Sequence, residues 1–351
     1  MSSGGRRRFL QWGVAGAAAA GAAAAVAWRG GKARARDEKL PEGMMPMRRL
    51  GRTGVDVSLV GLGGFHIGQA RDEQTAIRII RAAIDHGVNF MDNCWDYNDG
   101  RSHAWMGRAL RDGYRQRAFL MTKIDGRTRA AAAAQIDQSL RALDTDVIDL
   151  MQVHEVIRAT DPDRVFGPDG AIEALVAAQK AGMIRFLGFT GHKSPSIHLK
   201  MLEVAAAHRF AFDTVQMPVN VMDAHFDSFE RRVLPAAEKS GVAVLAMKPL
   251  GSGVFLRSAP LASGAISPTD CLRYAMASGA SVVITGCESM RDLGQALDAA
   301  YGYRALTDEQ RRTLLAYTGP AAERGEWEKY KVSEMFDGTG RNPHWLDSAK
   351  L

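Results

Sequence analysis

Cysteine is scarce in this chain, and its scarcity excludes some classes of protein. The 351 residues include three cysteines, Cys94, Cys271 and Cys287, whose odd number and scattered positions exclude a framework of disulfides. The sequence also lacks the histidine and cysteine spacings that are typical of a metal centre, so it predicts no metal site. Cys94 lies between Asp92 and Tyr97, where it is either a small apolar filler or a reactive thiol.

Acidic residues are absent from positions 1–35, and this absence accounts for the positive charge of the whole chain. The formal net charge is +6 at pH 7, and the segment holds six basic side chains, at positions 6, 7, 8, 29, 32 and 34. Removing it takes 6 from +6 and leaves the remainder near zero. A neutral remainder gives no electrostatic case for binding nucleic acid.

A long apolar run is also lacking at the N-terminus. The uncharged stretch from Trp12 to Trp28 is slightly shorter than the ~20 residues that a membrane-spanning helix needs, and it is rich in Ala and Gly. It follows the basic segment RRRFLQ (6–11) and precedes the tripeptide ARA (33–35). This arrangement is typical of a cleavable export signal.

The paired arginines before Phe9 and Leu10 resemble a twin-arginine (Tat) signal. The resemblance implies that residues 1–35 are a signal peptide read by the Tat translocon, which carries folded proteins. We therefore expect export to the periplasm and cleavage, with no stable membrane span in the mature protein. Two alternatives remain: the leader is not cleaved and anchors the protein in the membrane, or it is a low-complexity Ala tract with no role in export.

Beyond a short polar linker (36–45), strand-like and helix-like segments alternate. Apolar runs such as SLVGLG (58–63) and VNFMDN (88–93) are each followed by an amphipathic pattern, as in EQTAIRIIRAAIDHG (73–87). Six more such runs follow: AFLMTK, VIDLMQVH, IRFLGFT, TVQMPVN, VAVLAMK and SVVITG. Repeated β-then-α order with buried strands favours a parallel sheet, and eight strands suit a (β/α)8 TIM barrel. An open doubly wound sheet is the alternative.

Two further segments complete the predicted domain organisation. Residues 45–58 predict a β-hairpin with its turn near Gly51–Gly54. We expect the barrel to occupy residues 46–318, and we expect residues 319–351 to form a C-terminal tail over the active-site rim.

Four polar residues lie at or just beyond the ends of apolar runs: Asp92, Tyr97, Lys123 and His154. The carboxyl ends of parallel strands meet at one rim of a barrel, so we expect these side chains to lie together. An ammonium ~4 Å from a phenol oxygen stabilises the phenolate by roughly 4 kcal/mol at an effective dielectric of ~20, before the cost of burial. Lys123 is therefore expected to lower the pKa of Tyr97 and make it a general acid or base, with His154 orienting the substrate oxygen.

These residues resemble the Asp/Tyr/Lys/His tetrad of the aldo-keto reductases. The resemblance covers about residues 46–300, and further segments match in the family's order: VSLVGLGGF (57–65), GMIRFLGFTGH (182–192), DTVQMPVN (213–220), VLAMKPLGSG (244–253) and VVITGCESMRDL (282–293). It implies a barrel enzyme that passes hydride between a nicotinamide ring and a carbonyl carbon while Tyr97 delivers the proton. Its partner is then a small-molecule carbonyl or alcohol, whose identity the sequence does not give.

The same resemblance implies a cofactor site along the rim. The predicted contacts are Gly64, Phe65, Thr190, Gly191, His192, Gln216, Lys248, Pro249, Leu250, Gly251, Gly253, Gly286, Ser289 and Asp292. NADP is the expected cofactor. NAD remains possible because Asp292 stands where many relatives carry a residue that accompanies the ribose phosphate, and a carboxylate would repel that phosphate. The alternative function is a non-catalytic nucleotide-binding barrel with a regulatory or binding role.

Overall fold

A computed structural model describes residues 40–348 of the chain. The predicted signal peptide (1–35) and the first part of the linker (36–39) lie outside the described residues, as do residues 349–351. Within residues 40–348, none of the helices combines the length and apolar character needed to cross a bilayer.

Eight parallel strands close into a barrel, so the predicted fold is confirmed and the open sheet is wrong. The strands are β3 (Val60–Gly63), β4 (Phe90–Asp92), β5 (Phe119–Ile124), β6 (Ile148–Val153), β7 (Ile184–Thr190), β8 (Thr214–Pro218), β9 (Ala243–Met247) and β10 (Val282–Gly286). They pair in sequence order, and β10 pairs with both β9 and β3 to complete the ring. All eight lie within the predicted apolar runs, except that β5 extends one residue beyond its run.

The barrel interior is filled by side chains and closed at one end by the predicted hairpin. Strands β1 (Met47–Arg49) and β2 (Asp56–Ser58) pair antiparallel, and Gly54 closes the turn in the left-handed region at φ 78°. Leu50 and Val57 of the hairpin are fully buried in the same apolar cluster as Phe90 and Leu245. The hairpin therefore seals the floor, and the opposite rim, where the strands end, is free for a site.

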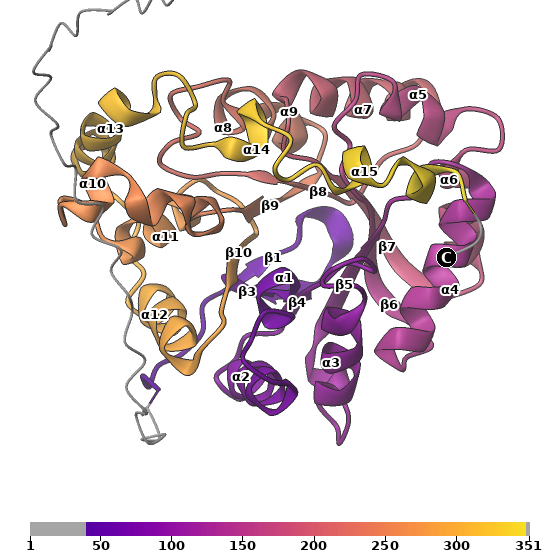
Figure 1. Cartoon of the computed structure of the whole chain (residues 1–351), viewed down its shortest axis with the longest axis horizontal. Helices are drawn as coiled ribbons and strands as arrows, with labels where there is room; N and C mark the ends of the chain where they lie inside the picture. Colours follow the sequence, from indigo (N-terminus) through magenta and orange to yellow (C-terminus); the bar gives the residue numbers. More distant parts are fainter. Residues whose placement is uncertain (1–39, 349–351) are drawn as a thin grey trace, which may run out of the picture. The chain divides into compact units, whose positions relative to one another are not determined.

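Helices surround the strands (Figure 1). The longer ones are α2 (Glu73–Asp85), α3 (Arg101–Ala109), α4 (Arg129–Leu143), α6 (Ala171–Lys180), α7 (Pro195–Ala207), α11 (Pro268–Met276) and α12 (Met290–Tyr301). Helix α2 shows how the sequence specifies them. Asp72 accepts a hydrogen bond from the Thr75 amide as N-cap, and Ile79 and Ile80 lie on the buried face against the barrel.

The C-terminal segment crosses the strand-end rim. Helix α13 (Asp308–Ala322) runs through the predicted boundary at 318/319, and the tail that follows holds α14 (Lys329–Val332), α15 (Gly338–Arg341) and a 3-10 turn (Pro343–Leu346). A buried ion pair fixes its start, since Lys331 Nζ lies 2.7 Å from Asp223 Oδ1 in the loop after β8. Near its end, the Leu346 carbonyl accepts a hydrogen bond from the Arg127 amide at 2.7 Å. The tail is thus tied to the barrel at both ends.

Candidate active site

The four predicted catalytic side chains meet at the rim where the strands end. Asp92 ends β4, and Lys123 is the next-to-last residue of β5. His154 follows β6 directly, and Tyr97 lies in the turns after β4. Lys123 Nζ lies 2.5 Å from Asp92 Oδ1 and 3.3 Å from the Tyr97 hydroxyl oxygen. The rings of Tyr97 and His154 pack edge to face with centroids 5.8 Å apart. The structure therefore brings the four residues together.

Lys123 is buried, and its ammonium makes three close polar contacts. Besides Asp92 and Tyr97 it donates to the backbone carbonyl of Asn93 at 2.6 Å. A buried ammonium is stable only when charge and hydrogen bonds compensate its lost hydration. Asp92 supplies the charge, and the phenol and the carbonyl complete the coordination.

Tyr97 differs from the prediction in the direction of its pKa shift. Burial raises the pKa of Tyr97 well above its ordinary value, and the carboxylates of Asp92 and Asp96 raise it further. The pKa of Tyr97 is therefore not lowered overall, because burial and the surrounding carboxylates outweigh the stabilisation that the Lys123 ammonium gives to the phenolate. The phenol therefore stays protonated at neutral pH, which suits a proton donor.

His154 is held by a carboxylate that the sequence analysis did not single out. Its Nδ1 lies 3.0 Å from Asp125 Oδ1 and 3.3 Å from Cys94 Sγ. Burial alone would lower the pKa of His154, but the Asp125 carboxylate more than offsets it, and the pKa is raised. The Trp95 indole donates to the other Asp125 oxygen at 2.7 Å and fixes the carboxylate. Since Nδ1 is engaged, Nε2 remains to contact a substrate oxygen.

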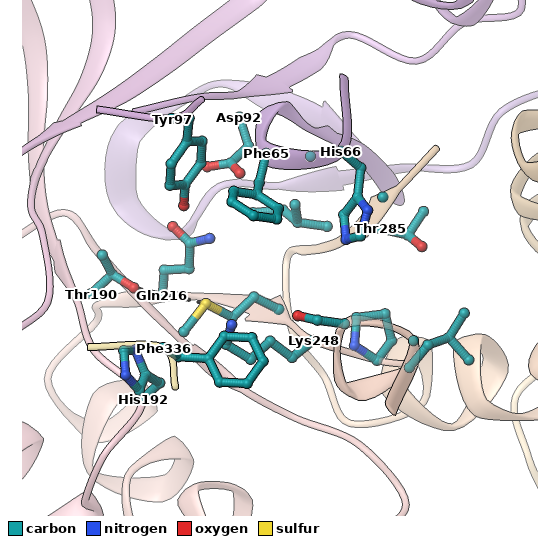
Figure 2. A pocket seen from close by; sticks show the side chains of 18 of the residues that line it. Phe65, His66, Asp92, Tyr97, Thr190, His192, Gln216, Lys248, Thr285 and Phe336 are labelled. Atoms are coloured by element: carbon teal, nitrogen blue, oxygen red, sulfur yellow. Dashed lines mark hydrogen bonds between the residues drawn. The ribbon is translucent and has the colours of Figure 1, made fainter. Parts of the chain in front are cut away.

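A pocket of about 1010 Å³ opens above these residues. Figure 2 shows Tyr97, Asp92 and Phe65 on one side of it and Lys248, Phe336 and His192 on the other. All four catalytic candidates line it, and so do these predicted cofactor contacts: Phe65, Thr190, Gly191, His192, Gln216, Lys248, Pro249, Leu250, Gly253, Gly286 and Asp292.

Gly64, Gly251 and Ser289 do not line the pocket. A Cβ at Gly64 would lie 2.5 Å from the Asp92 carbonyl oxygen, so this glycine permits close packing of the turn against the end of β4. Gly251 has φ 56° and a Cβ there would lie 2.4 Å from the Phe255 ring. Ser289 is the N-cap of α12. All three shape the backbone that borders the pocket.

The beginning of α12 changes the interpretation of Asp292. Its carboxylate accepts hydrogen bonds from the amide and the hydroxyl of Ser289, at 3.0 and 2.8 Å, and from the Glu288 amide at 3.2 Å. These contacts form a capping box, which satisfies amides at the helix start. The neighbouring Arg291 is exposed and lines the pocket. A ribose phosphate at this end would therefore meet a guanidinium as well as a carboxylate already occupied by backbone donors.

The loop after β9 presents a cation to the pocket. Lys248 and Ser252 have left-handed φ values of 56° each, which turn this loop over the strand end. Lys248 Nζ lies 4.4 Å from the centre of the Phe336 ring, and burial lowers the pKa of Lys248 to about 8. In residues 40–348 no carboxylate forms an ion pair with this lysine. It is suited to bind an anionic group.

The tail closes the pocket through two acidic anchors. Glu155 accepts hydrogen bonds from the amides of Gly338 and Thr339, at 2.8 and 2.7 Å, and from the Thr339 hydroxyl at 2.7 Å. Asp337 accepts from His192 Nε2 at 3.1 Å and pairs with Lys193 at 2.7 Å. His192 is thus engaged with the tail, and Phe336 and Met335 reach the pocket from it.

Sequence reasoning missed Asp96, Asp125 and Glu155. Each lies next to or near a predicted residue at a strand end, which was the available signal, but their partners lie on other elements. Burial raises the pKa of Asp96 to about 6. Although the sequence predicted no metal site, the structure places ligand atoms of Cys94, Asp96, Asp125 and His154 within 4.8 Å of one another.

The pocket residues fit a nicotinamide nucleotide. The side-chain oxygen of Gln216, the middle residue of β8, is buried and has no hydrogen-bond partner in the described part of the chain. Such an acceptor is costly unless a ligand supplies a donor, and a carboxamide NH2 would do so. Lys248 and Arg291 offer cations where a dinucleotide carries phosphates.

Comparisons with known proteins identify a family. The model of the aldo/keto reductase family matches residues 59–269. Aldo-keto reductase YhdN of Bacillus subtilis (strain 168) is 30% identical over 218 residues, which cover 58% of this chain and 61% of YhdN. The uncharacterized oxidoreductase YqkF of the same organism is 26% identical over 319 residues, covering 78% of this chain and 97% of YqkF. This chain thus spans less than two thirds of YhdN but nearly all of YqkF.

Solved structures share the fold. The holo form of aldo-keto reductase AKR11C1 from Bacillus halodurans aligns with a TM-score of 0.67 at 24% identity, covering 81% of this chain and 99% of that one. At this level of identity the likeness shows the barrel architecture alone.

The Asp125–His154 contact makes a prediction about titration. In Asp125→Asn the pKa of His154 should fall below its ordinary value, because burial remains while the compensating charge is removed. NMR titration of the imidazole nitrogens in metal-free buffer measures this pKa. Asp112→Asn, at an exposed ion pair with Arg81, should leave it unchanged. A His154 pKa that stays raised in Asp125→Asn would show that another group supports the imidazolium.

Proposed function

The chain belongs to the aldo/keto reductase family, and we propose that it interconverts an aldehyde or ketone and the corresponding alcohol with NADP(H), using Tyr97 as general acid and base. The observation that carries the proposal is the buried contact of Lys123 Nζ with both Asp92 and the Tyr97 hydroxyl, at the base of a large pocket. A protonated phenol is held there beside a fixed positive charge.

The residues divide the work of proton transfer. A bound nicotinamide nucleotide would supply or accept the hydride. Tyr97 donates its proton to the substrate oxygen, on which negative charge develops, and the His154 imidazolium hydrogen-bonds the same oxygen through Nε2. Once the proton has left, the phenolate is stabilised by the ammonium 3.3 Å away. The raised pKa thus keeps the Tyr97 phenol protonated, and Lys123 lowers the free energy needed to form the phenolate.

We assign the cofactor contacts from the geometry of the pocket. Gln216 in the middle of β8 and Thr190 at the end of β7 would meet the carboxamide, and Lys248 would meet the pyrophosphate. Arg291 would accompany the ribose phosphate of NADP. Because the Asp292 carboxylate is occupied in the cap of α12, it opposes that phosphate less than its position in the sequence implies.

A non-catalytic nucleotide-binding barrel is the competing function. Such a protein would need the cofactor pocket but not a proton donor held by a buried ammonium. Burying the Lys123–Asp92 ion pair costs desolvation free energy. Proton transfer during turnover gives this pair a role, whereas nucleotide binding alone does not. Removal of the phenol hydroxyl distinguishes the two functions.

Tyr97→Phe should lower kcat by about 10²- to 10⁴-fold, because it removes the transferable proton while keeping the ring. The affinity for NADPH should change less than about threefold. The measurement is steady-state oxidation of NADPH with a panel of reactive aldehydes, beside fluorescence titration of NADPH. Tyr114→Phe, at the outer surface contact with Asp85, is the matched control and should keep full activity.

Two results would contradict this assignment. Activity of Tyr97→Phe within a few-fold of the parent would remove Tyr97 from proton transfer. Binding of NADPH by the unmodified protein without turnover of any carbonyl in the panel would favour the non-catalytic barrel.

Arg291→Ala should weaken NADP binding by about tenfold or more and NAD binding much less, because the guanidinium is proposed to contact the group that distinguishes them. Calorimetric titration of both nucleotides decides this. Arg312→Ala, on the exposed side of α13, controls for loss of one positive charge. Equal weakening of both nucleotides would place the ribose phosphate elsewhere.

We also propose that residues 1–35 direct export of the folded protein to the periplasm through the Tat translocon. The support is the RRRFLQ segment followed by an uncharged Ala/Gly-rich stretch. Replacing Arg7 and Arg8 together with lysine should retain the chain in the cytoplasm, because lysine lacks the planar guanidinium. Cell fractionation measures where the protein is located, and mass spectrometry of the purified protein measures whether the leader has been removed. Full-length protein in the membrane fraction would instead support an uncleaved anchor, and unchanged export of the lysine variant would exclude the Tat route.

A further inference from the structure

We propose that Cys94, Asp96, Asp125 and His154 form a binding site for one Zn²⁺ ion beside the proton-donating Tyr97. One ligand atom from each residue lies within 4.8 Å of all the others. The closest contacts join His154 Nδ1 to Asp125 Oδ1 at 3.0 Å and to Cys94 Sγ at 3.3 Å. The ion site shares His154 with the proposed proton transfer, but binding of the ion does not depend on that reaction.

The donor set matches the coordination chemistry of zinc. Zn²⁺ takes thiolate, imidazole and carboxylate ligands in tetrahedral geometry, at about 2.3 Å for sulfur and about 2.0–2.2 Å for nitrogen and oxygen. Such bonds separate neighbouring ligand atoms by roughly 3.3–3.7 Å. The two observed contacts are within a few tenths of an ångström of this range. The remaining ligand atoms lie within 4.8 Å of one another, so side chains would have to close in by up to about 1 Å to bind the ion.

The distribution of charge favours a cation at this position. Asp96 and Asp125 place two carboxyl groups beside a thiol, and Asp96 Oδ1 is buried without a hydrogen-bond partner among residues 40–348. The nearby cations are engaged elsewhere, since Lys123 pairs with Asp92 and Arg127 with Asp161. A divalent ion would satisfy the buried oxygen and compensate both carboxylates.

The surroundings already orient the ligands. The Trp95 indole donates to Asp125 Oδ2 at 2.7 Å, which leaves Oδ1 facing His154. The Trp95 ring packs edge to face on Trp345 of the tail, with centroids 5.2 Å apart. Hydrogen bonds of this kind around metal ligands commonly set affinity as well as orientation. The site could not be predicted from the sequence, because its ligands follow three different strands and, apart from Cys94 and Asp96, are far apart in the chain.

Binding must release protons, because zinc binds the thiolate and the neutral imidazole. The Cys94 thiol loses its proton to solvent, and His154 loses the proton on Nδ1 if it carries one. His154 Nε2 is not a ligand and keeps its place toward the pocket. The ion would thus replace an imidazolium held by Asp125 with a neutral, metal-bound imidazole.

The test uses the full-length, tag-free protein stripped with a chelator and titrated with Co²⁺, followed by competition with Zn²⁺. Residues 1–39 contain no histidine or cysteine, so the leader adds no thiolate or imidazole ligand. We expect one Co²⁺ per chain with a thiolate-to-cobalt charge-transfer band in the near ultraviolet. One equivalent of Zn²⁺ should abolish the band.

Three variants and a control identify the ligands. Cys94→Ser should abolish the charge-transfer band, and Asp96→Asn should weaken binding by at least about tenfold. Trp95→Phe should weaken it by about 10- to 100-fold through the loss of its bond to Asp125. Cys271→Ser, which removes a buried thiol in α11, should change neither the band nor the affinity.

The proposal is overturned if no thiolate band forms, if the band persists in Cys94→Ser, or if Cys271→Ser abolishes it instead. Unchanged affinity in Asp96→Asn would also overturn it. Far-ultraviolet circular dichroism of each variant checks that the barrel is intact. If Cys94→Ser fails to fold, Asp96→Asn and Trp95→Phe carry the test.

Discussion

The buried ion pair of Lys123 and Asp92 is the constraint on which the site depends. Removing either partner would leave an uncompensated charge inside the barrel, which costs about 3–5 kcal/mol. The pair spans adjacent strands, β4 and β5, so it also fixes how these strand ends face each other. The phenol of Tyr97, the backbone carbonyl of Asn93 and the walls of the pocket are arranged around this ammonium. Stability and chemistry therefore rest on the same contact.

Around that pair the rim holds two proton-binding groups, Tyr97 and His154, whose pKa values are shifted by different surroundings. Burial and nearby carboxylates raise the pKa of Tyr97, whereas the Asp125 carboxylate raises the pKa of His154 against the effect of burial. In both groups the shift favours the protonated form, although for different reasons. In the proposed reaction, a substrate oxygen placed between them would meet two donors without rearrangement of the protein. This is electrostatic preorganisation built from burial and from carboxylates on neighbouring strand ends.

The sequence was sufficient for the barrel because each strand is a short apolar run followed by helical periodicity, as in residues 88–93. It also located Asp92, Lys123 and His154, since polar residues at the ends of such runs must share one rim. It could not give the direction of the Tyr97 pKa shift, which depends on how deeply the phenol is buried and on the carboxylates that surround it. Nor could it show that Asp292 turns back to cap α12, or that Glu155 meets residues 338 and 339. Those facts depend on rotamers and on contacts between segments far apart in the chain.

The hydrogen bonds of Glu155 connect the C-terminal tail to the residue next to His154. Glu155 follows His154 directly, and its carboxylate is fully occupied by two amides and a hydroxyl from residues 338–339. A tail transplanted from another barrel would leave this acid without donors one peptide bond from the imidazole. The part of the tail that contains residues 338–339 therefore cannot be exchanged freely between barrels. Redesign of substrate range by tail grafting would have to carry the helix start at residues 338–339 along with the new loop.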